Sequence, residues 1–158
     1  MMGLLNSFLI FTFINLNVAT SEPPAGEVDW MTFEQAIQKN QSNKRYIFID
    51  LYTDWCGWCK RMDATTFKES EVVTFMNEHF YSVKFDAEQK EDVKYKDQTF
   101  KFVAAGRNGI HQLAYALLDG QLSYPSFVVL DKQEKRVTVL KGYMDKASLL
   151  AKLKVIVK

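Results

Sequence analysis

Apolar and polar positions follow one another along this chain in a pattern that predicts strands alternating with helices. Residues 46–52 form a nearly continuous apolar and aromatic run, which is typical of a strand buried on both faces. Residues 81–86 and 126–131 are expected to form two further strands, and residues 136–140 are expected to pair with the second of these as a hairpin. Residues 98–103 predict a short extra strand.

Helical spacing of apolar residues separates these runs. Helices are expected over residues 32–41, 57–67, 70–79, 108–118 and 146–157. Thr32 and Gln35 have the spacing of a capping box at the start of the first helix, and Ser70 is expected to cap the third. Strands that alternate with helices and end in a hairpin predict an α/β fold, with a mixed central β-sheet and helices on both faces.

The first residues differ in composition from the rest. Residues 1–20 combine an apolar core with small residues at its end, which predicts a signal peptide and hence export. An uncleaved membrane anchor is the alternative, although the segment is short and polar for a span of about 20 residues. Residues 21–28 are expected to form a linker, and residues 29–158 one compact domain.

Charge gives little indication of a partner. The chain has 20 Lys and Arg against 19 Asp and Glu, a net charge of +1, and it contains no basic run. A nucleic-acid partner is therefore not expected, and we expect a monomer whose partners are chosen by shape and chemistry.

Cys56 and Cys59 are the only two cysteines, separated by two residues where an apolar run ends and a helical pattern begins. This placement favours a redox dithiol. A zinc site needs about four protein ligands, and only His79 and His111 remain as good partners, far apart in sequence. An inert structural disulfide is the other alternative. We expect no metal and no bound cofactor, because the sulfur pair itself can carry the electrons.

A thiolate at a helix start faces unpaired backbone N–H groups and the positive end of the helix dipole, so its pKa falls and its reactivity rises. Cys56 is nearest the helix tip and is the predicted nucleophile. Cys59, one turn deeper, is the predicted resolving thiol and is expected to be buried.

Residues 50–60 (DLYTDWCGWCK) resemble the active-site segment of the thioredoxin superfamily, including the acid six positions before the first cysteine. Residues 124–127 (YPSF) resemble the loop whose cis proline faces the dithiol in that family, and residues 141–144 (KGYM) its glycine turn before the last helix. The helix that follows the dithiol is similar to that of secreted bacterial thioredoxin-like thiol-disulfide oxidoreductases. The resemblance implies a thioredoxin-like fold, with an insertion over residues 88–123 before the cis-proline strand.

The resemblance also implies roles for residues around the dithiol. Asp50 would accept the proton of Cys59, although it could be an ordinary strand-end acid. Pro125 would follow a cis peptide bond that exposes backbone groups to a substrate, although a trans proline opening a strand is the alternative. The predicted substrate-binding residues are Trp55, Gly57, Trp58, Tyr124 and Pro125.

The dipeptide between the cysteines is Gly57-Trp58 rather than the Gly-Pro of typical thioredoxins. Oxidants of the superfamily carry a histidine where Trp58 stands, and an indole brings no charge to stabilise the thiolate, so the sequence favours a reductant of protein disulfides. Such a reductant needs an upstream electron donor, and a membrane-bound donor is one candidate. The alternatives are an oxidase or isomerase of the same compartment, or a non-catalytic interaction domain. Residues 107–111 in the insertion either shape a partner surface or are plain scaffold.

Overall fold

The computed structural model describes residues 26–158, and the predicted signal peptide and most of the predicted linker lie outside them. The central sheet has five strands: β1 (Trp30–Met31), β2 (Tyr46–Tyr52), β3 (Phe80–Asp86), β8 (Ser126–Leu130) and β9 (Arg136–Lys141). They lie in the order β1-β3-β2-β8-β9. The first three are parallel, and β8 and β9 are antiparallel additions. The predicted mixed sheet is therefore confirmed.

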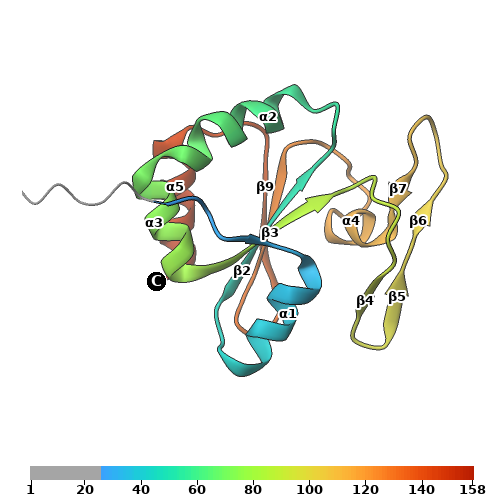
Figure 1. Ribbon diagram of the computed structural model, residues 1–158, viewed down its shortest axis with the longest axis horizontal. Helices are drawn as coiled ribbons and strands as arrows, with labels where there is room; N and C mark the ends of the chain where they lie inside the picture. Colours follow the sequence, from blue (N-terminus) through green and yellow to red (C-terminus); the bar gives the residue numbers. More distant parts are fainter. Residues whose placement is uncertain (1–25) are drawn as a thin grey trace, which may run out of the picture.

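Helices cover both faces of the sheet (Figure 1). They are α1 (Phe33–Ser42), α2 (Gly57–Ala64), α3 (Ser70–His79), α4 (Gln112–Leu117) and α5 (Lys146–Ile156). The side chains of β2 alternate between two apolar clusters: Ile47, Ile49 and Leu51 pack with α1 and α4, whereas Phe48 packs with α2, α3 and α5. Because alternate residues of a strand point to the same face, Asp50 points to the α2 side of the sheet.

The structure confirms the predicted start of α1. The Thr32 side chain accepts the backbone N–H of Gln35 at 3.2 Å, and the Gln35 side chain accepts the backbone N–H of Thr32 at 2.9 Å. Two other helix predictions were wrong. The helix expected over residues 57–67 ends at Ala64, and a 3-10 turn (Thr66–Lys68) follows, in which Thr66 and Phe67 both face inward. The cap of α3 is Glu69, not Ser70, and no side chain caps that helix.

The insertion folds into two small hairpins, β4 (Val93–Tyr95) with β5 (Gln98–Phe100), and β6 (Phe102–Val103) with β7 (Ile110–His111). Figure 1 shows them beside α4, on the side of the molecule away from α5. The single strand expected over residues 98–103 is therefore two strands with different partners. The helix expected over 108–118 begins only at Gln112, because the residues before it pair in β7 and Gly109 turns the chain with a φ of +77°.

Gln112, the first residue of α4, binds the start of this helix to Lys101, which lies between β5 and β6. Its side-chain amide oxygen accepts the backbone N–H of Lys101 at 2.8 Å, and its backbone N–H donates to the Lys101 carbonyl at 2.8 Å.

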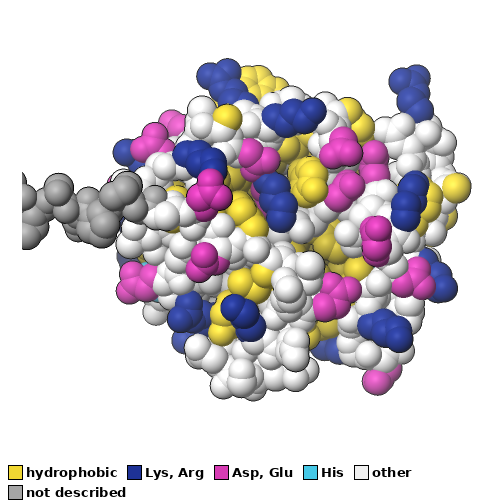
Figure 2. All heavy atoms as spheres, viewed as in Figure 1, with side chains coloured by type: hydrophobic (Ala, Val, Ile, Leu, Met, Phe, Trp, Pro, Cys, Tyr) yellow, Lys and Arg dark blue, Asp and Glu magenta, His cyan; other side chains and the backbone are white. Residues whose placement is uncertain are grey.

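The surface is mixed in charge. Figure 2 shows basic and acidic side chains interspersed with small hydrophobic patches on one face of the molecule. None of the described helices is both long and apolar enough to cross a membrane.

Candidate active site

Cys56 and Cys59 lie where β2 gives way to α2 and form a disulfide with an S–S distance of 2.03 Å. Cys56 is the N-cap of α2, and its Sγ accepts the backbone N–H of Cys59 at 3.1 Å. This is the predicted position of the nucleophile, at the positive end of a helix. Cys59 is buried as expected, and Cys56 is also buried in this oxidised form, at 3% and 4% exposure.

Asp50 is 1% exposed and lies on β2 beneath α2. Its Oδ2 accepts a hydrogen bond from the Lys84 ammonium at 2.7 Å, and the same ammonium pairs with Asp63 on α2. The other carboxylate oxygen, Oδ1, has no hydrogen-bond partner among residues 26–158. Burial raises the pKa of Asp50 to about 6, against the opposing effect of Lys84. A carboxyl group with this pKa can give up or take a proton near neutral pH.

The peptide bond between Tyr124 and Pro125 is cis, as expected. The Pro125 carbonyl accepts the backbone N–H of Gly142 at 2.9 Å, which joins the proline loop to the glycine turn. Gly142 has a φ of +80°, a conformation that favours glycine. Burial raises the pKa of Tyr124 to about 12, and the nearby Glu88 and Asp86 carboxylates also raise it.

Both tryptophans of the dithiol segment are exposed, Trp55 at 60% and Trp58 at 55%. The edge of Trp55 meets Tyr124, with ring centroids 5.9 Å apart, which brings the proline loop beside the dithiol segment. Gly57 is exposed, and a Cβ atom added to it would meet no atom within 4 Å. Of the predicted substrate-binding residues, Trp55, Gly57 and Trp58 are thus exposed, whereas Tyr124 is half-buried and Pro125 is buried. The binding role of all five stays a prediction.

The His111 side chain, in the insertion, is fully buried. The imidazole Nδ1 accepts the backbone N–H of Leu113 at 3.2 Å and thereby caps α4. Its Nε2 lies 3.1 Å from the Glu91 carbonyl, and burial lowers the pKa of the ring. His111 is therefore a structural group. No cluster of three or more His, Cys, Asp or Glu side chains suited to a metal occurs in residues 26–158.

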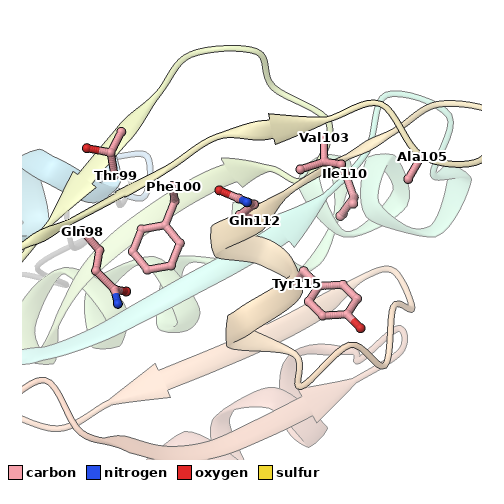
Figure 3. A pocket seen from close by; sticks show the side chains of 8 residues that line it. All are labelled: Gln98, Thr99, Phe100, Val103, Ala105, Ile110, Gln112 and Tyr115. Atoms are coloured by element: carbon pink, nitrogen blue, oxygen red, sulfur yellow. The ribbon is translucent and has the colours of Figure 1, made fainter.

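A hollow of about 720 Å³ lies in the insertion between β5, β7 and α4 (Figure 3). Its lining is formed by Gln98, Thr99, Phe100, Val103, Ala105, Ile110, Gln112 and Tyr115. None of these residues belongs to the dithiol segment, and none carries a charge at neutral pH. The hollow therefore lies apart from the dithiol segment in sequence and has no charged side chain in its lining.

The sequence analysis missed Lys84, Asp63, Glu88, Arg61 and Tyr143, all of which contact predicted site residues or their neighbours. One signal could have identified Lys84. It interrupts a mostly apolar strand, and a lysine partly buried there needs an acidic partner, which Asp50 on another apolar strand supplies. Arg61 lies three residues after Trp58 on one predicted helix, a spacing that places both on the same face. The other three required knowledge of how distant segments pack.

The model of the Thioredox_DsbH family, described as a protein of unknown function, DUF255, matches residues 20–152. The Chlamydia pneumoniae disulfide bond reductase DsbH is 28% identical over 82 residues, 49% of this chain and 49% of the relative. The Campylobacter jejuni thiol:disulfide interchange protein DsbD is 27% identical over 84 residues, 52% of this chain and 15% of the relative. Human spermatogenesis-associated protein 20 is 32% identical over 74 residues, 46% of this chain.

The chain spans about a tenth of some of these relatives: the match covers 9% of the human protein and 11% of an uncharacterized Caenorhabditis elegans protein. A solved DsbH oxidoreductase superposes with a TM-score of 0.63 at 19% identity, over 89% of this chain and 92% of that one. A Thermus thermophilus thioredoxin superposes with a TM-score of 0.62 at 16% identity, over 83% and 88%. The predicted thioredoxin-like fold is confirmed.

The raised pKa of Asp50 predicts a pH-dependent stability. Between about pH 4 and pH 6 the folded state holds the Asp50 proton more tightly than the unfolded state, so the free energy of unfolding falls as pH rises through this window. Asp50→Asn removes this dependence. The free energy of unfolding of the variant, minus that of wild type, should rise by at most about 3 kcal/mol between pH 4 and pH 6. Above pH 6 this difference should level off.

Urea unfolding of both oxidised proteins at several pH values measures this difference. Asp97→Asn, at an exposed acid, is the matched control and should show no such rise. A constant difference between wild type and Asp50→Asn across the range would show that Asp50 does not titrate there.

Proposed function

The chain belongs to the Thioredox_DsbH family, and from this premise we propose that it is a thiol-disulfide oxidoreductase that reduces protein disulfides. The observation that carries the proposal is the Cys56–Cys59 disulfide, whose first sulfur caps α2 directly after the central strand. Relatives named as a disulfide bond reductase and a thiol:disulfide interchange protein support it.

In the proposed reaction, the Cys56 thiolate attacks one sulfur of a client disulfide and displaces the other as a thiolate, which takes a proton from solvent. Cys59 then loses its proton and attacks the Cys56 sulfur, so that the second client sulfur leaves as a thiolate. Two electrons have passed from the dithiol to the client, and the protein holds the disulfide seen in this structure. A separate donor must reduce it again.

The surroundings suit both steps. The N-terminus of α2 stabilises negative charge on Cys56, which favours the ionised form that attacks the client in the first step. Asp50, with a pKa of about 6, is mostly ionised at pH 7 and can accept the proton of Cys59 directly or through water. Its unpartnered Oδ1 leaves an acceptor site open for that proton.

The proposed direction of electron flow, from the dithiol to the client, is based on the identity of residue 58. An exposed indole there supplies no positive charge to hold the reduced thiolate, so the dithiol gives up its electrons more readily than in oxidants that carry a histidine at this place. The alternatives are an oxidase or isomerase of the same compartment, and a non-catalytic domain in which the disulfide is structural.

Replacing Cys59 with Ser should trap the proposed intermediate, because no second thiol remains to release the client. Incubation of reduced Cys59→Ser protein with a disulfide-containing peptide should yield a stable mixed disulfide in which Cys56 is linked to the peptide, detected as an added mass. Cys56→Ser should give no adduct at a comparable rate. If neither variant forms an adduct, the pair is structural and the reductase proposal is wrong.

The reduction potential of the Cys56–Cys59 couple separates a reductant from an oxidant. We expect a value near the roughly −270 mV of thioredoxin, whereas about −120 to −180 mV would place the protein with oxidants and isomerases. Equilibration with dithiothreitol or glutathione buffers, followed by fluorescence of the adjacent Trp55 and Trp58, measures it. A Trp58→His variant should have a more oxidising potential, because a charged imidazole would stabilise the thiolate.

We also propose that residues 1–20 direct export and that a membrane-bound donor reduces the protein on the far side. This proposal predicts that the protein recovered from cells begins near residue 21 and that the Cys56–Cys59 pair faces the exported compartment. Mass determination of the mature N-terminus checks the first point, and modification by a membrane-impermeant thiol reagent in intact cells checks the second. A full-length protein whose cysteines stay protected would contradict export.

A further inference from the structure

Two aromatic pairs flank the dithiol. Trp55 meets Tyr124 with ring centroids 5.9 Å apart, and Trp58 meets Tyr143 at 5.3 Å. Each pair joins one tryptophan of the dithiol segment to one tyrosine of the proline loop or the glycine turn. The hydrogen bond from the Gly142 N–H to the Pro125 carbonyl, at 2.9 Å, connects those two turns, so the two pairs border one surface.

The Trp55 pair is acidic. The Trp55 indole N–H donates to Glu88 Oε1 at 2.8 Å, and the same oxygen accepts from the Asn108 amide at 3.2 Å. Asp86 lies close by, and its pKa is raised by burial and by nearby carboxylates that include Glu88. An anionic group on a client would be repelled at this end.

The Trp58 pair is basic. The Arg61 guanidinium lies 5.4 Å from the Trp58 ring centroid and 5.5 Å from that of Tyr143. Arg61 and both rings are exposed. Within residues 26–158 no carboxylate forms an ion pair with Arg61.

Three acids on neighbouring segments are already engaged. Asp63 pairs with Lys84, and Glu69 pairs with Lys146 at 3.3 Å. Asp145 accepts the backbone N–H of Ser148 at 2.8 Å as the cap of α5. The guanidinium therefore keeps its hydrogen-bond donors available beside the dithiol.

We propose that Arg61 is a specificity-determining residue that selects client segments with an Asp or Glu side chain close to the disulfide-bonded cysteine. The inference rests on the proposed reductase function. A guanidinium can bind a carboxylate through two parallel hydrogen bonds, and packing on two rings limits the freedom that binding would remove. Because the Glu88 end repels the same carboxylate, the client segment is bound in one orientation.

Single-turnover reduction of synthetic peptides tests the proposal. Each peptide carries one cysteine as a mixed disulfide with 2-thiopyridine, a leaving group without a carboxylate, and differs only in having Glu or Lys two residues before or after that cysteine. We expect the reduced protein to react about ten times faster with the better Glu peptide than with its Lys counterpart at low salt. The ratio should fall towards one as salt rises, because exposed charges are screened.

The readout is the ratio of Glu-peptide to Lys-peptide rates within each variant, so that any change in dithiol reactivity cancels. Arg61→Gln should lower the ratio to below about two. Arg61→Lys should keep an intermediate ratio, because it retains the charge and loses the two-hydrogen-bond geometry. Lys60→Gln removes a neighbouring exposed cation and is the matched control, which should keep the wild-type ratio.

An equal loss in Lys60→Gln and Arg61→Gln would overturn the assignment, because the preference would then come from general positive charge. A wild-type ratio near one at low salt would also overturn it. If the wild-type protein fails to reduce even 2,2′-dithiodipyridine, a small neutral disulfide, then the proposed function itself is wrong. Reaction with that reagent but no preference among the peptides would leave the reductase function standing and reject only the role of Arg61.

Discussion

The buried carboxylate of Asp50 must be compensated by a cation, and this constraint connects the three elements beneath the dithiol. Lys84 stands directly beside Asp50 in the register of β2 and β3, and its ammonium also reaches Asp63 on α2. An uncompensated charge in this position would be strongly destabilising. One lysine therefore links the two paired central strands to the helix that carries the dithiol.

Turns at the ends of neighbouring strands form the site. β2 delivers the dithiol at its carboxyl end, and β8, which pairs with β2, begins directly after the cis proline. The glycine turn after β9 is tied to that proline by a backbone hydrogen bond. Three turns thus meet at one edge of the sheet, and their aromatic residues form the walls around a disulfide that is itself only slightly exposed.

Much of this arrangement could be predicted from the sequence. Continuous apolar runs such as that of β2 identify central strands, and the Thr32–Gln35 spacing identifies the start of α1. Predictions were less accurate where tertiary contacts decide the local structure. The strands of the insertion are two or three residues long, too short to show a clear alternation of apolar and polar positions. His111 is buried by packing that no local sequence pattern reveals. The contacts of Arg61 with Tyr143 and of Glu88 with Trp55 likewise depend on segments distant in sequence.

Glu88 stands at the start of the insertion, holds the indole of Trp55 and is itself held by Asn108 from the far turn of the insertion. Neither of these two contacts involves a sulfur atom, Asp50 or Lys84. Substitutions in the insertion can therefore reshape the wall beside the disulfide while the Asp50–Lys84 pair stays in place. The exposed surface beside the disulfide and the buried ion pair beneath it can thus change one at a time during evolution.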